Sequence, residues 1–334
     1  MQTVVVKGRV FNYSHAMGRG SDGGIGFRNP VDLALNSDGV MFVLSRGSDA
    51  NPVQRVTVLT MEEEFIREFG GPGEDDGQFV WATAIAFDSE GLLYLADEWL
   101  NRISVFDQDG NFIRKWGVPG REAGQLNGPA GIVFDNQDNL FITENLNHRV
   151  QKFTKEGRFI LKWGTHGSDQ EQLTRPWGIA MDGVGDIYVA DWYNDRVQKY
   201  TPDGKYLATF GAPKGTAGQL HLPSDVAVDK DGDVYVTDWW NCKVEVYEPE
   251  GNHLTTFVGD AEKLSRWAQD FIDDNPDYRR ARMMAKSLEP EQRFYMPVAI
   301  EISSDGKIMV AEDQRWRIQV YQKEEDWIDP QFNL

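Results

Sequence analysis

A motif recurs through this chain with a period of 47 residues, and no other feature of the sequence constrains the fold as strongly. The segment ADWYNDRVQKY (190–200) returns as ADEWLNRISVF (96–106), TENLNHRVQKF (143–153), TDWWNCKVEVY (237–247) and AEDQRWRIQVY (311–321). The acids near its start, Asp97, Glu144, Asp191 and Asp238, follow one another at steps of 47 residues. A fixed period of this length is typical of propellers and solenoids.

Two further copies of the unit are less regular. Glu312 lies 74 residues after Asp238, which is one period plus a 27-residue insertion. A degenerate first copy occupies residues 29–45, where Ser45 stands in place of the acid. The chain therefore contains six copies of the unit.

Each unit reads as four short strands. Turn-forming segments such as DGVGD and TPDG separate runs rich in β-branched and aromatic residues, and these runs lack helical periodicity. Four strands repeated at this period describe a propeller blade. We therefore predict an all-β, six-bladed β-propeller of four-stranded blades that occupies residues 1–334 as a single domain.

The consensus of the unit resembles the NHL repeat. The residues that carry this resemblance in the third copy are Gln125, Pro129, Gly131, Asn147, His148 and Arg149. It extends over about residues 20–325, so it implies NHL-like blades. The resemblance says less about activity, because that family includes binding scaffolds, protein-interaction and RNA-binding domains, and a few enzymes.

The two ends of the chain are expected to meet in one blade. The sequence stops without the outermost strand that GKYLATFG supplies elsewhere, whereas KGRVFNYSHAMG near the start resembles a fourth-strand segment. An N-terminal strand that completes blade six would leave no open sheet edge.

Charge and composition restrict the partners. A formal net charge of −19 disfavours a nucleic-acid partner, because the Lys and Arg residues are scattered rather than clustered. The single cysteine, Cys242, cannot form an intramolecular disulfide, and no apolar run reaches membrane-spanning length. We expect a soluble cytoplasmic protein, although a removed signal peptide would leave no trace.

The recurring acid and the Arg five residues later, as in Asp191 with Arg196, are interpreted as scaffolding. A catalytic pair has no need of a copy in nearly every blade, whereas a buried carboxylate that orders a turn does. The departures from the repeat are more informative. Asp32 and Asp225 replace the Gly or Ala found at the innermost column in other blades.

Two interpretations of these acids remain open. In the first, Asp32 and Asp225 bind a cation or a substrate amine. In the second, they only accept hydrogen bonds from water and from backbone groups. The resemblance to lactonase-type propellers, which hold a calcium-like ion, implies a metal set of Asp32, Asp225, Glu144 and Asn145. The five histidines lie outside the innermost column, which argues against a three-histidine zinc centre. The candidate catalytic residues are Asp32, Asp225 and Arg46.

Aromatic residues gather in the loops expected on one face, called here the loop face. Each ring could pack between blades, but as a group they indicate a mouth that stacks on a ligand. The loop at residues 45–55 also departs from the repeat and brings Arg46, Asp49 and Asn51 to this face. The predicted ligand-binding residues are Arg46, Trp81, Trp177, Trp192, Asp225, Trp239 and Tyr295.

The 260–296 segment interrupts the repeat between blades five and six and carries a helical pattern at Leu264, Trp267, Ala268 and Phe271. It either forms a lid over the central pocket, or plugs the channel or makes a dimer contact. The functional prediction is a pocket on the loop face for a small organic ligand or short peptide. The alternatives are a metal-assisted lyase or hydrolase that uses a divalent cation such as calcium, and a protein-interaction scaffold.

Overall fold

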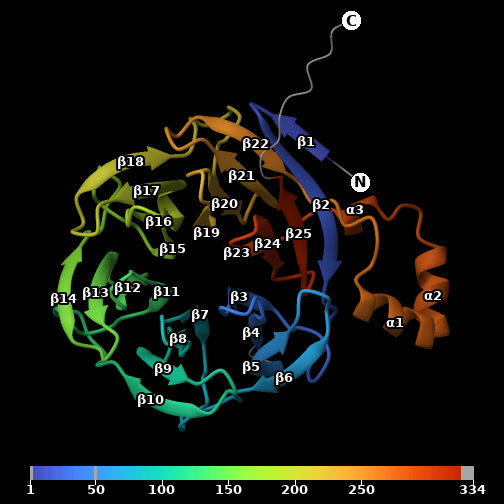
Figure 1. Cartoon of the computed structure of the whole chain (residues 1–334), viewed down its shortest axis with the longest axis horizontal. Helices are drawn as coiled ribbons and strands as arrows, with labels where there is room; N and C mark the ends of the chain where they lie inside the picture. The colour runs from blue at the N-terminus through green and yellow to red at the C-terminus, as the bar shows by residue number, and fades with distance from the viewer. Residues whose placement is uncertain (1–2, 49–50, 325–334) are drawn as a thin grey trace, which may run out of the picture.

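The chain forms a ring of antiparallel sheets around a central channel (Figure 1). The computed structural model describes residues 3–48 and 51–324. The six sheets in these ranges correspond to the six copies of the repeat, with the first strand of each nearest the axis. The predicted six-bladed propeller is therefore confirmed.

The first five blades each contain four strands in chain order. Blade 1 contains β3 (Pro30–Leu35), β4 (Met41–Ser48), β5 (Asn51–Leu59) and β6 (Phe65–Phe69). Blade 2 contains β7 (Ala82–Phe87), β8 (Leu93–Asp97), β9 (Arg102–Phe106) and β10 (Phe112–Trp116). Blade 3 contains β11 (Pro129–Phe134), β12 (Asn139–Glu144), β13 (Arg149–Thr154) and β14 (Phe159–Trp163). Blade 4 contains β15 (Pro176–Met181), β16 (Ile187–Asp191), β17 (Arg196–Tyr200) and β18 (Tyr206–Phe210), with a 3-10 turn, η1 (Trp192–Asn194), after β16. Blade 5 contains β19 (Pro223–Val228), β20 (Val234–Asp238), β21 (Lys243–Tyr247) and β22 (His253–Phe257).

Blade 6 joins the two ends of the chain. It combines β23 (Pro297–Ile302), β24 (Lys307–Glu312) and β25 (Arg317–Lys323) with the N-terminal β2 (Arg9–Met17) and β1 (Thr3–Val6). Strand β2 pairs antiparallel with β25, with Tyr13 opposite Tyr321. The expected closure by the N-terminal strand is confirmed, and β1 adds a fifth strand outside it.

The strand pattern follows burial. All five residues of β16 are buried, whereas β14 alternates half-buried and exposed positions because only one of its faces packs on a neighbour. Between the first two strands of blade 4, the carboxylate of Asp182 accepts hydrogen bonds from the N–H groups of Val184 (3.1 Å) and Asp186 (2.9 Å), which closes the turn. The core consists of six apolar layers, one between each pair of neighbouring blades.

The insertion contains the predicted helices, α1 (Arg266–Asp274) and α2 (Pro276–Met283), followed by a short α3 (Glu289–Gln292). Helices α1 and α2 lie outside the ring, beside the junction of blades 6 and 1 (Figure 1). No residue of the insertion lines the channel in the part of the chain described here. The expectation of a lid over the central pocket is therefore wrong. In these ranges, moreover, no helix has the length and apolar character needed to cross a bilayer.

Two buried contacts explain this position. Glu63, in the turn between β5 and β6, accepts hydrogen bonds from the N–H groups of Gly18 (2.6 Å) and Trp267 (3.3 Å). Ser265 caps α1 and also donates to the carbonyl of Gly18 (2.7 Å). Trp267 then enters the apolar layer between blades 6 and 1, with its ring centroid 5.9 Å from that of Phe27. The insertion therefore fastens the junction at which the ring closes.

We predict that Trp267→Ala destabilises the fold by about 3–5 kcal/mol, because a buried aromatic side chain leaves a cavity. Thermal or urea unfolding measures this loss, and hydrogen exchange should show faster opening in β2 and β25 than in blade 3. Trp99→Ala is the control, since Trp99 is 69% exposed and its loss should have little effect. Equal destabilisation by the two variants would contradict the anchoring role.

Candidate functional site

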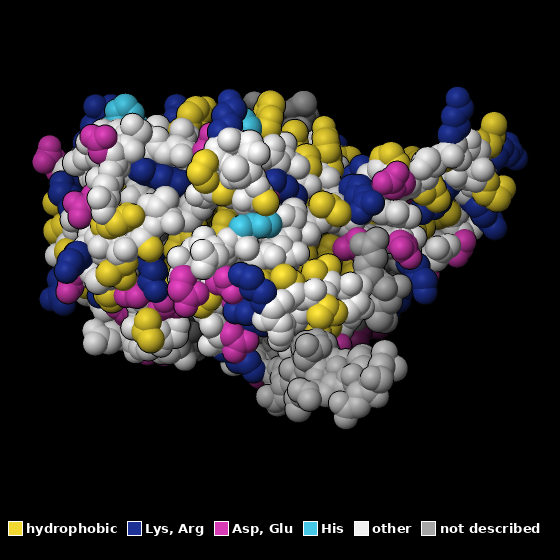
Figure 2. All heavy atoms as spheres, turned by 90° about the horizontal axis from the view of Figure 1, so that it is seen from above, with side chains coloured by type: hydrophobic (Ala, Val, Ile, Leu, Met, Phe, Trp, Pro, Cys, Tyr) yellow, Lys and Arg dark blue, Asp and Glu magenta, His cyan; other side chains and the backbone are white. Residues whose placement is uncertain are grey.

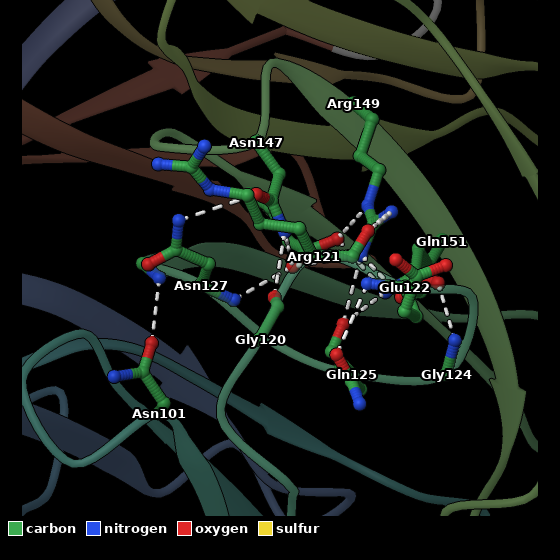
Figure 3. Close-up of polar contacts among 12 residues, drawn as sticks. Asn101, Gly120, Arg121, Glu122, Gly124, Gln125, Asn127, Asn147, Arg149 and Gln151 are labelled. Carbon is green, nitrogen blue, oxygen red and sulfur yellow. Dashed lines mark hydrogen bonds and ion pairs between the residues drawn. The ribbon is translucent and has the colours of Figure 1, made fainter.

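The repeated acids hold the repeats together. In blade 3, Glu144 is fully buried and forms an ion pair with Arg149, and it also accepts hydrogen bonds from Asn127 N–H (2.8 Å) and Asn147 Nδ2 (2.9 Å). Arg149 also donates to backbone carbonyls of the preceding inter-blade loop, including that of Gln125 (2.9 Å). Figure 3 shows these groups converging around Arg149. The pair ties a blade to the loop that enters it, as the scaffolding interpretation predicts.

Blade 4 repeats this arrangement with Asp191 and Arg196, whose Nε lies 2.9 Å from Oδ2. Burial raises the pKa of Glu144 and of Asp191, and the hydrogen-bond donors around each carboxylate oppose that shift. Blade 2 departs from the pattern. There the carboxylate of Asp97 accepts hydrogen bonds from backbone N–H groups, including that of Val80 (2.7 Å), while Arg102 donates to loop carbonyls. The ion pair between the acid and the Arg is thus not found in every blade. The hydrogen bond from the Arg to a carbonyl of the preceding loop recurs in blades 2, 3 and 4.

The central channel encloses about 370 Å³ and is lined by the first strands of all six blades. Asp32 and Asp225 both lie in its wall. Asp32 accepts hydrogen bonds from the N–H of Leu33 (2.9 Å) and from the N–H of Ile85 in blade 2 (2.7 Å). Asp225 likewise accepts from the N–H of Ile300 in blade 6 (2.9 Å). Each aspartate therefore links two inner strands, which supports the hydrogen-bonding interpretation.

Asp225 also explains the neighbouring glycine. A Cβ at Gly178 would lie 2.2 Å from Oδ1 of Asp225 and 2.8 Å from the carbonyl oxygen of Ser224. The inner strands of blades 4 and 5 are therefore too close for any side chain at position 178. The repeated Gly131 meets the backbone of Trp177 in the same way.

Glu301 is a third channel acid that the sequence analysis missed. It occupies the column of Ala34, Ala86 and Ala227, which a column-by-column comparison of the blades would have singled out. Burial raises the pKa of Glu301 to about 8, and the charge of Asp225 adds to this effect. Burial also raises the pKa of Asp225 to about 7 and that of Asp32 well above its ordinary value. A raised pKa favours the neutral, protonated form of each of these carboxyl groups.

We predict that stability falls as the pH rises from about 5 to about 9. The folded-state pKa of Glu301 is raised, so its contribution is fully present below its unfolded pKa and is lost as the pH passes through about 8. Glu301→Gln should lose less stability over this range, by on the order of 2 kcal/mol or more. Urea unfolding at several pH values measures the difference. Glu250→Gln, at an exposed carboxyl, is the control and should follow the wild type.

The proposed metal ligands do not converge. Glu144 is engaged by Arg149 and its neighbours, while Asn145 donates from Nδ2 to Oε1 of Glu98 (3.0 Å). Within residues 3–48 and 51–324, no group of three or more His, Cys, Asp and Glu side chains is arranged to hold a metal. Asp32 and Asp225 share the channel without the other two residues of the expected set.

Part of the predicted aromatic mouth is assembled. The indole rings of Trp177, Trp192, Trp239 and Trp240 follow one another with successive centroid distances of 5.7, 5.3 and 6.0 Å. We call these four rings the tryptophan ladder. It crosses blades 4 and 5, and Trp177 also lines the channel. The first three rings are half-buried, whereas Trp240 is 58% exposed.

The other predicted ligand residues form separate contacts. The guanidinium of Arg46 lies 4.1 Å from the ring centroid of Trp81, and that of Arg315 lies 5.6 Å from the ring centroid of Tyr295. Asn51 donates to Asp22 (2.9 Å), and Asp49 lies outside the described residues. The structure therefore divides the predicted pocket into the ladder, the Arg46 stack and the channel that contains Asp225.

These features define a six-bladed propeller with an acidic channel and an aromatic sector on its loop face. A family model for the NHL repeat matches residues 126–153, 173–200 and 220–247, which lie in blades 3, 4 and 5. Blades 3, 4 and 5 thus match the NHL repeat, and the six blades agree with the propeller that this repeat implies. A comparison with curated proteins gave no match.

Solved structures share the fold at low sequence identity. A streptogramin B lyase structure is 14% identical with a TM-score of 0.59, over 94% of this chain and 98% of that chain. A catalytically inactive virginiamycin B lyase from Staphylococcus aureus with quinupristin is 12% identical with a TM-score of 0.55, over 88% of this chain and 94% of that chain. A protein of unknown function from Bacteroides thetaiotaomicron is 17% identical with a TM-score of 0.63, over 95% of this chain and 76% of that chain. At these identities the likeness concerns the fold alone.

Proposed function

We propose that this propeller is a binding protein whose tryptophan ladder takes a small organic ligand or a short peptide that carries a planar group. The ladder is the observation that supports this proposal. Four consecutive indoles from two blades offer more aromatic surface than packing between two turns requires, and the outermost ring stays largely exposed. Stacking against such a surface suits sugars, aromatic rings and planar side chains.

The channel next to the ladder would offer polar groups to the same ligand. Trp177 belongs both to the ladder and to the channel wall, where Asp225 also lies. A ligand that stacks on Trp177 could therefore extend a donor group toward these carboxyl groups. Protonated carboxyls would donate and accept hydrogen bonds there without the cost of a buried, unpaired charge.

We predict that Trp192→Ala and Trp239→Ala each weaken ligand binding about tenfold or more, since stacking on an indole contributes roughly 1–3 kcal/mol. A panel of oligosaccharides, aromatic metabolites and short peptides, screened by calorimetry or ligand-observed NMR, should first yield a binder. Trp99→Ala is the matched control, because Trp99 is an exposed tryptophan in the corresponding turn of blade 2 and lies outside the ladder. A binder that responds to Trp99→Ala but not to the ladder variants would place the site elsewhere.

The second candidate is a metal-assisted lyase or hydrolase acting at the channel mouth. Its candidate catalytic groups are Asp32 and Asp225, which lie in the channel wall with Glu301, and Arg46, which stacks on Trp81 outside the channel lining. Such an enzyme would need a divalent cation such as calcium as a Lewis acid on a carbonyl group, and the described residues present no group of three or more side chains arranged to hold it.

Elemental analysis of protein purified without chelator distinguishes the two candidates. For a binding protein we expect well below one equivalent of any divalent metal per chain. About one equivalent, lost in Asp225→Asn but retained in Asp203→Asn at an exposed turn, would instead favour the enzyme.

A further inference from the structure

A second cavity lies between the helical insertion and the edge of blade 6, away from the channel and the tryptophan ladder. This groove encloses about 650 Å³. Seven of its lining residues are apolar or aromatic: Ala16, Leu264, Ala268, Phe271, Ile272, Tyr278 and Trp316. Phe271 and Ile272 are half-buried, so the apolar surface is recessed rather than raised.

The sides of the groove are positively charged. Arg19, Lys263 and Arg315 line it, and the guanidinium of Arg19 lies 4.9 Å from the ring centroid of Phe271. Glu291 is the one carboxylate among the described lining residues, and Arg282 already forms an ion pair with it. The groove therefore combines an apolar floor with cations that lack carboxylate partners inside it.

Helix α2 extends this basic character. Residues 278–286, YRRARMMAK, contain four cations and no acid, although the chain as a whole has a formal charge of −19. Elsewhere in the chain the Lys and Arg residues are scattered. Figure 2 shows dark blue, yellow and magenta side chains together on the lobe that projects from the ring on the right. Acids lie close by on the same lobe, at Asp270, Asp273, Asp274 and Asp277, and Asp277 lies 4.0 Å from Arg280. The positive charge is therefore confined to the groove lining and to residues 278–286.

We propose that this groove binds an acidic segment of another protein, with apolar side chains in the groove and carboxylates paired to the lining cations Arg19, Lys263 and Arg315. The segment would continue past Tyr278 to Arg279 and Arg280, which lie on α2 outside the lining. A recessed floor suits side chains that project from a peptide, whereas a bilayer surface cannot enter it. The groove shares no residue with the tryptophan ladder, so the test of this proposal does not depend on the proposed function.

The test uses the full chain and a fluorescein-labelled 14-residue peptide of alternating Glu and Phe or Leu residues, with fluorescence anisotropy as the readout. A peptide with Gln in place of Glu is the uncharged control. The double variant Arg279→Glu/Arg280→Glu reverses two exposed charges on α2. Lys205→Glu/Lys214→Glu makes the same change in net charge at exposed positions of blade 4 and the loop that follows it. Thermal unfolding verifies that each variant is folded.

We expect the acidic peptide to bind at least about tenfold more tightly than the Gln peptide. The α2 variant should lose about tenfold or more in affinity, while the control variant should stay within about twofold of the wild type. Equal weakening by both variants, or no acidic-peptide binding below about 1 mM, would overturn the proposal. Three competing occupants would also overturn it if the α2 variant abolished their binding instead: phosphatidylserine vesicles, poly-uridine RNA, or a second copy of this chain detected by light scattering.

Discussion

The antiparallel pairing of β2 with β25 is the interaction on which the rest of the structure depends. Each blade buries its apolar faces only against its two neighbours, so all six layers require that the ring be closed. The two strands that close it lie at opposite ends of the chain, with Met17 opposite Ile318 and Phe11 opposite Lys323. The insertion reinforces this junction from outside through Glu63 and Trp267. The largest departure from the repeat thus lies at the junction where the ring closes.

The sequence predicts the blades well because their determinants are local and repeated. A buried acid, an Arg that reaches the preceding loop and an Asx-type turn recur at the same spacing, so each copy supports the reading of the others. The position of the insertion could not be read in this way. The anchor for its first helix is Glu63 in blade 1, some 200 residues earlier in the chain, and no periodic pattern links Glu63 to Ser265. The expectation of a lid was wrong for this reason.

The candidate site shows the same division between local and non-local information. The tryptophan ladder joins equivalent turns of adjacent blades, which the period of 47 residues places side by side, and three of its four members were among the predicted ligand residues. Glu301 was overlooked because it breaks an Ala column after the insertion has shifted the register. Whether a channel acid is charged depends on burial and on other carboxyls around the axis, which are properties of the closed ring rather than of any one repeat.

The close approach of Gly178 to blade 5 sets a limit on the width of this channel wall. A side chain at position 178 would collide with Oδ1 of Asp225, and also with the Cα of Asp225 and the carbonyl oxygen of Ser224. Removal of the carboxylate would relieve only the first of these clashes and would free the N–H of Ile300 in blade 6. Position 178 is therefore restricted by the backbone of its neighbour, so ring geometry as well as channel chemistry accounts for the glycine there.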